Sequence, residues 1–243
     1  MKTLLAITTY NQLKYTKLLI ESLRSINLTG IDIIFIDDVS TDGTVKYLKE
    51  SKYLFNSREI PKGLTESWNI AYRMFKNKNY DNLIIANNDI LLSQGSLNEM
   101  ISLLKTNSFV VPLSTKKGAG HNWKEQGIDK YYPNLINAAA DHKKFKLVQK
   151  QIEKSKKSSI KISNFNGFIF GLNKKVTASE FNSNNLFDPK LTNVGQETDL
   201  QQRLKEPPTL ALKSFVFHFK GVSFPIKGLK NGKDVRQNLN LYH

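Results

Sequence analysis

Polar clusters that directly follow apolar runs hold the side chains best suited to chemistry, and the first lies between Phe35 and Thr44. It carries three carboxylates in the order Asp-Asp-Val-Ser-Thr-Asp. Ligands of open α/β sheets collect at the carboxyl ends of strands. Ser40 or Asp42 could instead cap a following helix, with Asp37 at the rim of the strand. Capping explains one or two of the three aspartates, so we expect at least one of them to contact a ligand.

A second cluster, Asn87-Asn88-Asp89, follows the apolar run at residues 83–86. Asp89 suits a hard divalent cation, because Mg²⁺ and Mn²⁺ take oxygen ligands and often combine one protein carboxylate with substrate phosphates. A turn would use the same three residues. The triplet alone therefore does not separate a metal site from a turn.

The third and fourth clusters lie late in the chain. Residues 193–204 read as a helix with acidic residues in its first turn, where Asp199 and Arg203 suit an i, i+4 ion pair. Glu197, at the mouth of that helix, is the better candidate for a base that reaches a substrate. His218 leaves an apolar strand; alone it is typical of a half-buried core residue, but with Asp89 it could complete a metal shell.

Several enzyme classes lack their expected motifs. His121, His142 and His243 show no ligand spacing to one another, and the sequence has no His-Glu-x-x-His motif and no serine nucleophile elbow. It also has no Gly-Lys-Ser/Thr phosphate loop and no Gly-x-Gly-x-x-Gly turn after the first apolar run. These absences disfavour zinc and serine hydrolases, P-loop nucleotidases and Rossmann dehydrogenases.

Composition predicts one folded domain. The 243 residues are 40% hydrophobic and 23% charged, which is ordinary for a globular protein. No apolar run approaches the roughly 18 residues that a membrane span needs, and the N-terminal run is too short for a signal peptide. The sequence has no cysteine, which fits a reducing compartment. We therefore expect a cytoplasmic protein.

The net charge of +15 favours an anionic partner such as phosphate, a lipid surface or nucleic acid. Only five of the 36 basic residues are arginine, which disfavours sequence-specific reading of bases. A lysine-rich helix is expected at residues 136–157. It is either a solvated face or a patch for an anionic acceptor or lipid surface, and the abundant lysine also fits a codon bias towards A and T.

Alternation of short apolar runs with helically spaced segments predicts an α/β protein with a mostly parallel sheet flanked by helices. We expect strands at residues 2–9, 31–36, 53–56, 83–86, 109–113, 168–172 and 210–217. We expect helices at residues 13–23, 41–50, 64–75, 95–104, 136–157 and 197–204. After residue 114 the alternation fails, and residues 116–123 predict a long loop.

Taken together and in order, these clusters resemble the nucleotide-sugar glycosyltransferases of family 2, which have the GT-A fold, a three-layer α/β/α sandwich. The resemblance covers nearly the whole chain. The opening Thr-Thr-Tyr-Asn at residues 8–11, followed by the aspartates at 37–42, is similar to the family's nucleotide-binding start. The resemblance implies that Thr8 and Tyr10 line the base pocket and that Asp38 hydrogen-bonds the base.

The remaining motifs carry further implied roles. Residues 62–69 resemble the family's glycine-containing segment with its trailing Asn69 near the diphosphate, and Asn87-Asn88-Asp89 stands in place of Asp-x-Asp. Asp89 would then meet the metal bound to the diphosphate. Gln196-Glu197 stands where the family usually has Glu-Asp, which implies Glu197 as catalytic base. His218, with Ser223, resembles the late histidine motif that adds a metal ligand.

The sequence departs from the family pattern at two positions. Asn87 replaces the first aspartate of Asp-x-Asp, as in several rhamnosyltransferases of the family, and Glu197 is one methylene longer than the usual aspartate. No Gln-x-x-Arg-Trp motif follows Arg203, so a processive synthase is disfavoured.

The resemblance therefore implies an inverting, metal-dependent, non-processive enzyme of carbohydrate biosynthesis that uses Mn²⁺ or Mg²⁺. It would move one sugar from a UDP-, GDP- or dTDP-linked donor to a glycan, glycolipid or glycoprotein hydroxyl, with no nucleic acid expected. We expect residues 1–243 to form one domain, with a nucleotide-sugar-binding half at 1–113 and an acceptor half at 114–243. Aromatic side chains that could either stack on acceptor sugars or belong to the core are Trp123, Tyr131, Phe165 and Phe168.

Two other interpretations remain. A sugar-phosphate nucleotidyltransferase shares a similar architecture but needs a glycine-rich basic loop after the first strand, and none is visible. A catalytically silent module that binds a nucleotide-sugar or nucleic acid would use its positive charge for phosphate contacts. Binding that falls steeply with salt and ignores Asp89 would favour that module.

Overall fold

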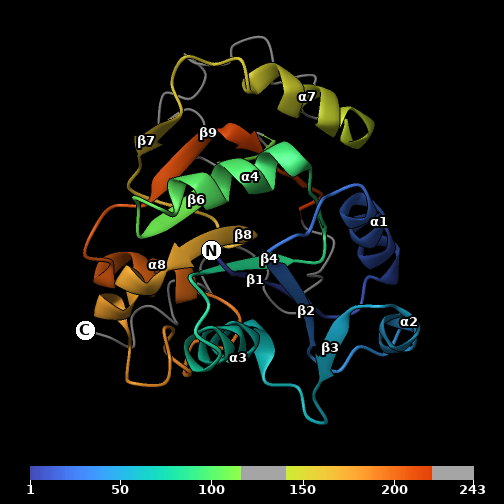
Figure 1. The fold of residues 1–243 in the computed structure, drawn as a ribbon. Coiled ribbons are helices and arrows are strands. Elements are labelled where there is room, and N and C mark those ends of the chain that lie inside the picture. Colours follow the sequence, from blue (N-terminus) through green and yellow to red (C-terminus); the bar gives the residue numbers. More distant parts are fainter. Residues whose placement is uncertain (116–140, 221–243) are drawn as a thin grey trace, which may run out of the picture.

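The computed structural model describes residues 1–115 and 141–220, which form three layers with a twisted sheet between helices (Figure 1). The sheet has eight strands in the order β3-β2-β1-β4-β8-β6-β9-β7, and β5 pairs with β10 in a separate small sheet. The strands are β1 (Thr3–Thr9), β2 (Ile31–Asp37), β3 (Leu54–Ser57), β4 (Asn82–Asn87), β5 (Ile90–Leu91), β6 (Phe109–Leu113), β7 (Ser159–Lys161), β8 (Ile169–Asn173), β9 (Thr209–Phe215) and β10 (Phe217–His218).

Six of the eight strands run in one direction. β1, β2, β3 and β4 are mutually parallel, and β6 pairs with β9 in parallel. β8 is antiparallel to both β4 and β6, and β7 is antiparallel to β9. The predicted α/β class with a mostly parallel sheet is confirmed. The strands from the two halves of the chain are interleaved, since β8 lies between β4 and β6.

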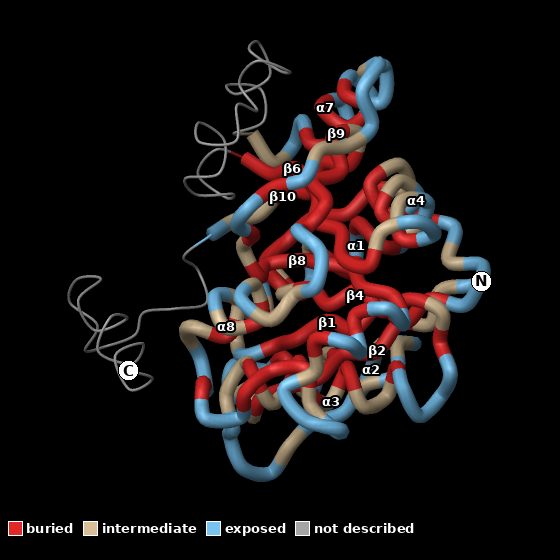
Figure 2. The backbone as a smooth tube through the Cα atoms, turned by 90° about the vertical axis from the view of Figure 1, so that its left-hand side faces the viewer, coloured by how far each residue is buried: buried red, intermediate tan, exposed pale blue. Residues whose placement is uncertain are grey.

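Alternate residues of each strand face opposite helical layers, because successive side chains of a strand point to opposite sides. Leu4 and Ala6 of β1 join one buried cluster, whereas Leu5 and Ile7 join the other. Every residue of β1 is buried, and Figure 2 shows this burial continuing through β4 and β8. A strand that is buried on both faces reads as a continuous apolar run.

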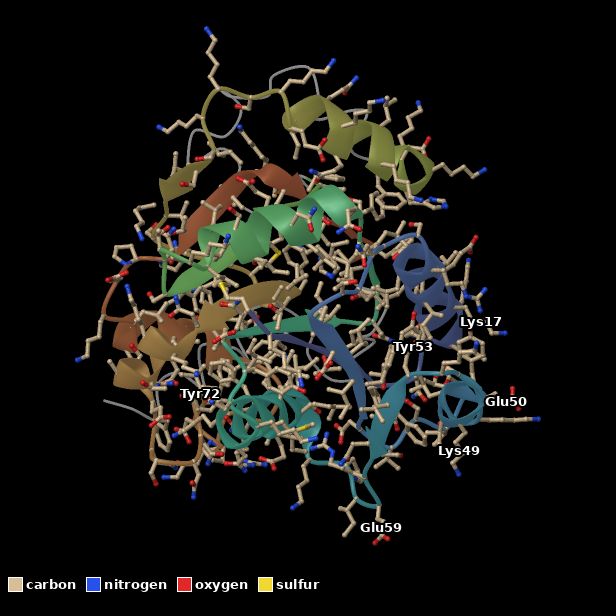
Figure 3. The ribbon with its side chains drawn as sticks, in the orientation of Figure 1. Lys17, Lys49, Glu50, Tyr53, Glu59 and Tyr72 are labelled. Atoms are coloured by element: carbon tan, nitrogen blue, oxygen red, sulfur yellow. The ribbon has the colours of Figure 1, made fainter. Side chains whose placement is uncertain are left out.

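The helices contribute their apolar residues to two buried clusters. One cluster takes apolar residues from α1 (Leu13–Arg24), α2 (Thr44–Glu50) and α4 (Gln94–Leu103). The other takes them from α3 (Gly63–Asn77), α7 (Phe145–Ile152) and α8 (Gln196–Arg203). Charged side chains stay outside, as Lys17 on α1 and Lys49 and Glu50 on α2 show (Figure 3).

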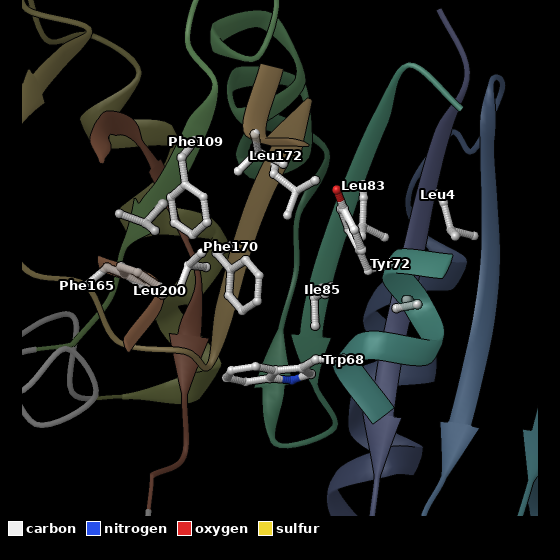
Figure 4. Packing of buried hydrophobic residues seen from close by; sticks show 14 of the residues in the cluster. Leu4, Trp68, Tyr72, Leu83, Ile85, Phe109, Phe165, Phe170, Leu172 and Leu200 are labelled. Carbon is white, nitrogen blue, oxygen red and sulfur yellow. The ribbon is translucent and has the colours of Figure 1, made fainter. Parts of the chain in front are cut away.

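Aromatic side chains fill the centre of the face covered by α3. The fully buried Trp68 of α3 packs edge-on against Phe170 of β8, with ring centroids 5.1 Å apart, and against Phe187 at 5.0 Å. Phe170 in turn stacks on Phe109 of β6 at 5.4 Å (Figure 4). Phe165 packs on both Phe109 and Phe170, so it belongs to this core.

The prediction of a long helix at residues 136–157 is wrong in its extent. The helix α7 spans Phe145–Ile152 and follows the short 3-10 turn η3 (His142–Lys144); residues 136–140 lie outside the described residues. Only Phe145, Val148, Gln149 and Ile152 are buried, so the apolar face ends after two turns and the lysines and serines that follow give no packing support. The short strands β5 and β7 and the 3-10 segment η4 (Lys174–Ser179) were not predicted.

Within residues 1–115 and 141–220, none of the helices has the length and apolar character required to cross a bilayer.

Candidate functional site

The carboxyl ends of β1, β2 and β4 bring the predicted polar residues together. In the parallel registers, Thr9 is opposite Asp37 and Thr8 is opposite Asn87. Thr8 also donates its hydroxyl to Asn87 Oδ1 at 3.3 Å. The ends of these three strands therefore form one wall.

A cavity of about 430 Å³ opens beside this wall. It is lined by the predicted Thr8, Tyr10, Asp38, Asn87 and Asn88, and by the predicted segment 62–64. Tyr10 is half exposed, so its ring is free to meet a flat ligand. The cavity is also lined by Thr192 and Asn193, which the sequence did not single out for this site.

Asp37 has a structural role. The alternative interpretation, with Asp37 at the rim of its strand, does not hold, since Asp37 is fully buried. Its carboxylate accepts hydrogen bonds from the Thr9 hydroxyl at 2.9 Å, from the Ser40 amide at 2.9 Å and from the Ser40 hydroxyl at 2.5 Å. Ser57 donates a weaker one at 3.3 Å. These donors compensate the buried charge and fix the turn after β2.

Asp42 joins two helices. Its Oδ1 accepts from the Thr44 amide at 3.1 Å and its Oδ2 from the Leu13 amide at 2.8 Å, so it serves the first turns of α2 and α1. The residue that precedes α2 is Gly43, in the left-handed region at φ 91°. Ser40 does not cap α2; its hydroxyl accepts from the Asn11 amide. The predicted capping therefore falls to Asp42 alone.

Asp38 holds the segment that forms the floor of the cavity. Its two carboxylate oxygens accept from the Lys62 and Gly63 amides, each at 2.9 Å, and Oδ1 pairs with Arg58 Nη2 at 2.5 Å. Arg58 Nη2 also donates to the Gly63 carbonyl and to the Ser67 hydroxyl. Asp38 thus faces the cavity while anchoring residues 58–63.

Residues 191–193 cap the start of α3. The Leu64 amide donates to Asn193 Oδ1 at 3.1 Å and the Thr65 amide to the Thr192 carbonyl at 3.0 Å. Gly63 has φ 82°, and a Cβ there would stand 2.6 Å from the Thr192 carbonyl oxygen. This close approach needs glycine. No local sequence signal reveals a contact between residues more than a hundred positions apart.

Of the two remaining predicted asparagines, Asn88 lies at the cavity and Asn69 does not. Asn88 is buried and its amide group donates to the Asn11 carbonyl and to Thr16 Oγ1, so it ties β4 to α1 at the edge of the cavity. Asn69 is fully buried and exchanges two hydrogen bonds of 3.0 Å with the backbone of Phe187. The structure does not bring Asn69 into the cavity; it positions the chain near Phe187.

Asp89 and His218 form a buried pair. β5 and β10 pair antiparallel with Ile90 opposite His218, and the Phe219 amide donates to the Asp89 carbonyl at 3.0 Å. This places His218 Nε2 3.3 Å from Asp89 Oδ2. Asp89 is only 2% exposed, and its Oδ1 has no hydrogen-bond partner among the described residues.

These two side chains fit a divalent cation that takes further oxygen ligands from a substrate. Burying a carboxylate oxygen without a partner costs free energy unless a cation or a hydrogen-bond donor contacts it. In residues 1–115 and 141–220 no group of three or more acidic or histidine side chains could hold a metal. The protein would therefore supply Asp89 and His218, and phosphate oxygens and water would fill the other positions, as Mg²⁺ sites commonly arrange.

Glu197 lies in a second cavity of about 470 Å³, which shares Leu64, Asn87 and Asn193 with the first. His218 lines this cavity as well. Burial raises the pKa of the Glu197 carboxyl above its ordinary value of 4.5, and hydrogen bonds from its own amide and from the Gly167 amide partly oppose this rise. The structure thus brings the predicted base and the predicted metal ligand to one cavity.

An i, i+4 ion pair lies on the helix that carries Glu197. Asp199 pairs with Arg203 Nη2 at 2.5 Å, as predicted, and the same nitrogen donates to the Leu186 carbonyl at 2.8 Å. Gln196, one residue before Glu197, is buried and lines the second cavity; its Oε1 finds no partner in the described part of the chain. Sequence reasoning gave Gln196 no role of its own.

The predicted acceptor aromatics separate into three cases. Phe165 belongs to the core, although it borders the second cavity. Phe168 stacks on the His218 ring, with centroids 4.7 Å apart and ring planes 11° apart. Trp123 and Tyr131 lie outside the described residues, as do His121, Ser223 and His243 and the loop at 116–132.

Comparison with known proteins matches this arrangement to one family. The sequence model of one protein family, described as glycosyl transferase family 2, matches residues 5–178. The fold is similar to GalNAc-T7 with UDP, GalNAc and Mn²⁺, at a TM-score of 0.63 and 14% identity over 90% of this chain and 44% of that one. The sequence has no significant match among curated proteins.

Two other solved structures share the fold. S. aureus TarS 1-349 in complex with UDP has a TM-score of 0.57 and 14% identity over 89% of this chain and 60% of that one. The mannosyltransferase PcManGT from Pyrobaculum calidifontis, in complex with GDP-Man and Mn²⁺, has a TM-score of 0.59 and 12% identity over 93% of this chain and 58% of that one. The predicted GT-A type architecture is confirmed. The chain spans less than two thirds of the length of these three proteins.

Proposed function

Because the chain belongs to glycosyl transferase family 2, we propose that it is an inverting, metal-dependent, non-processive glycosyltransferase. It moves one sugar from a nucleotide-diphosphate donor to an acceptor hydroxyl. The observation that carries this proposal is a pair of adjoining cavities, the first lined by Thr8, Tyr10 and Asp38 and the second by both Glu197 and His218, the partner of Asp89.

The first cavity suits the nucleotide part of the donor. Tyr10 offers an exposed ring for a base, and Thr8 and Asp38 line the same space. Structures with this fold contain UDP, UDP-GlcNAc or GDP-Man, which supports a UDP- or GDP-linked donor, and a dTDP-linked donor remains within the proposal. Asn87 stands where the cavities meet, close to the reacting bond of such a donor.

Asp89 and His218 would hold the divalent cation, Mn²⁺ or Mg²⁺. The bound cation supplies charge neutralisation at the departing diphosphate. Asp89 Oδ1 is the carboxylate oxygen left for this contact, since Oδ2 faces His218. Mn²⁺ in the structures of GalNAc-T7 and PcManGT supports this assignment.

Glu197 would take the proton from the acceptor hydroxyl. In an inverting transfer the hydroxyl attacks the anomeric carbon from the face opposite the leaving diphosphate, so one base on the acceptor side suffices. A base works best when its pKa lies near the operating pH, and burial moves the pKa of Glu197 in that direction. The carboxamides around it, Asn164, Asn166 and Gln201, suit an acceptor rich in hydroxyls such as a glycan, glycolipid or glycoprotein.

Glu197→Gln tests this function. We expect kcat to fall by about 10³-fold, within the range for loss of a general base, while donor affinity with Mn²⁺ stays unchanged in calorimetry. Asp199→Asn is the matched control, because it lies on the same helix and pairs with Arg203. It should retain transfer. Transfer by Glu197→Gln within tenfold of the unmodified protein would overturn the proposal, and donor binding without any transfer by the unmodified protein would support the catalytically silent module.

We also propose that α7 gives the enzyme a contact with an anionic membrane surface. On η3, α7 and the residues just after α7, the side chains of Lys143, Lys144, Lys150 and Lys154 are exposed, as is Leu147 of α7. Each lysine near an anionic bilayer contributes on the order of 1 kcal/mol.

Flotation with phosphatidylserine vesicles tests the membrane contact. Replacing Lys143, Lys150 and Lys154 by glutamine should abolish binding, whereas the same change at Lys46, Lys49 and Lys52, on and after α2, should not. Figures 1 and 2 place α2 far from α7. Equal loss in both triple variants would contradict a local contact.

A further inference from the structure

Two consecutive residues, Gly167 and Phe168, touch both halves of the proposed site. The Gly167 amide donates to Glu197 Oε1 at 3.2 Å. The Phe168 carbonyl accepts from the Asn87 amide at 2.8 Å, and its ring stacks on that of His218. One dipeptide at the start of β8 therefore contacts the proposed base, the end of β4 and the histidine beside Asp89.

Gly167 leaves no room for a side chain. A Cβ built there would stand 2.5 Å from Trp68 Cη2, 2.6 Å from Glu197 Oε1 and 2.9 Å from Glu197 Cγ. Trp68 cannot retreat, because it is fully buried and its ring packs against Phe170 (Figure 4) and against Phe187. Because Trp68 holds its place, a side chain at position 167 would force the backbone there away from the Trp68 ring, and the Glu197 carboxylate that the Gly167 amide bonds would be displaced.

The ring of Phe168 restrains His218 in a similar way. A ring stacked at 4.7 Å and 11° limits rotation of the imidazole. Rotation would carry Nε2 away from its position 3.3 Å from Asp89 Oδ2. The orientation of a ligating histidine is commonly set by such outer contacts.

We propose that Gly167 and Phe168 are positioning residues that fix the base and the histidine of the metal pair relative to each other. This inference rests on the proposed function. Displacement of a reacting group by about 1 Å can cost about 10²-fold in rate. Because the same dipeptide contacts both Glu197 and His218, it holds the proton acceptor at a fixed distance from the diphosphate end of the donor.

Gly167→Ala tests the base side. We expect kcat to fall by about 10²-fold while donor affinity with Mn²⁺ and acceptor KM change less than about threefold. Gly171→Ala is the matched control, because its Cβ would meet Leu104 Cδ1 at 2.9 Å in the core. It should lower the melting temperature and leave kcat unchanged. An equal loss of kcat in both variants would overturn the proposal.

The double variant Gly167→Ala with Trp68→Phe separates positioning from core packing. Phenylalanine lacks the Cη2 atom that the new Cβ meets, but the contact with Glu197 remains. We expect kcat to stay low in the double variant. Recovery of kcat to the level of Trp68→Phe alone would show that the clash with Trp68 caused the loss, and would overturn the positioning of Glu197.

Phe168→Leu tests the metal side by binding instead of activity. Leucine keeps an apolar side chain but removes the stacked ring. We expect donor affinity in Mn²⁺ to fall by about tenfold, and donor affinity in chelator to stay unchanged, both by calorimetry. An unchanged response to Mn²⁺ would overturn the role of Phe168.

The two levels of inference fail differently. If Glu197→Gln retains transfer, the proposed function itself fails. If Glu197→Gln abolishes transfer while Gly167→Ala and Phe168→Leu behave like Gly171→Ala, the positioning inference fails and the proposed base stands.

Discussion

The ends of β2 and β4 look alike in sequence but differ in how their carboxylates are partnered. After β2, Asp37, Asp38 and Asp42 each accept at least two hydrogen bonds from the surrounding chain. After β4, Asp89 is buried like Asp37 and Asp38, yet it faces a histidine with one oxygen and has no partner for the other in the described residues.

This difference separates fold-building carboxylates from a carboxylate available for a ligand. Buried charge is tolerated when donors compensate it, and the aspartates after β2 are compensated by backbone amides, hydroxyls and Arg58. Asp89 lacks that compensation, so a cation or a donor from a ligand would stabilise it. The cluster with more aspartates in the sequence, at the end of β2, is therefore the one whose carboxylates are already hydrogen-bonded within the fold.

Loss of Asp89 should have the largest effect on ligand binding. A cation at a transferring phosphate contributes several kcal/mol, so Asp89→Ala should weaken Mn²⁺-dependent donor binding by at least about 10²-fold. Titration calorimetry with Mn²⁺ and with chelator measures this. If Asp89→Ala keeps a donor affinity that responds to Mn²⁺, the contrast between the two strand ends carries no functional meaning.

Loss of Asp37 should instead act on stability. Asp37→Ala leaves the Thr9 hydroxyl and the Ser40 amide without their acceptor, which should lower the free energy of unfolding by about 3 kcal/mol. Urea unfolding measures the loss. Donor affinity of the folded variant should stay within about threefold; a collapse of affinity at unchanged stability would reverse the roles assigned to the two strand ends.

Loss of Arg58 should have an intermediate effect on donor affinity, since Arg58 acts on the cavity through Asp38 and the segment that Asp38 holds. Arg58→Met removes one charged hydrogen bond to Asp38 and the contacts to Gly63 and Ser67, which loosens the cavity floor. We expect donor affinity to fall by about tenfold, which corresponds to one charge-assisted hydrogen bond. Calorimetry in chelator should show the same loss, because Arg58 does not act through the metal.

The smallest expected effect is a change in the pH dependence of stability when Glu197 is replaced. Its folded-state pKa lies above the ordinary 4.5, so between these two values the folded state binds more protons than the unfolded state and stability falls as pH rises. Glu197→Gln removes this penalty. The variant should melt slightly above the unmodified protein at pH 7, and the gap should close below pH 4.5. A gap that widens at low pH would contradict a raised pKa. The acid limb of kcat should likewise lie above pH 4.5.

Much of the fold could be read from the sequence. The alternation of apolar runs and helical spacing predicted the elements from β1 to β6, except β5, to within a few residues, because strands buried on both faces and amphipathic helices leave strong local patterns. The same reasoning overextended α7, since lysines spaced like a helix do not make one without apolar contacts. It missed β5 and β7, which are two and three residues long and exist only through their partners β10 and β9.

The site divides along the same line. Residue order alone predicted the family, now confirmed, and pointed to Asp89, Glu197 and His218, because polar residues next to apolar runs and acidic residues at a helix start are visible locally. Only the tertiary structure showed that Asp37 is buried, that Asn69 is bonded to Phe187, and that Thr192, Asn193 and Gly167 belong near the cavities. A sequence specifies which donors and acceptors a chain has. Which of them are already paired depends on contacts between distant segments, and that pairing decides which charges remain for chemistry.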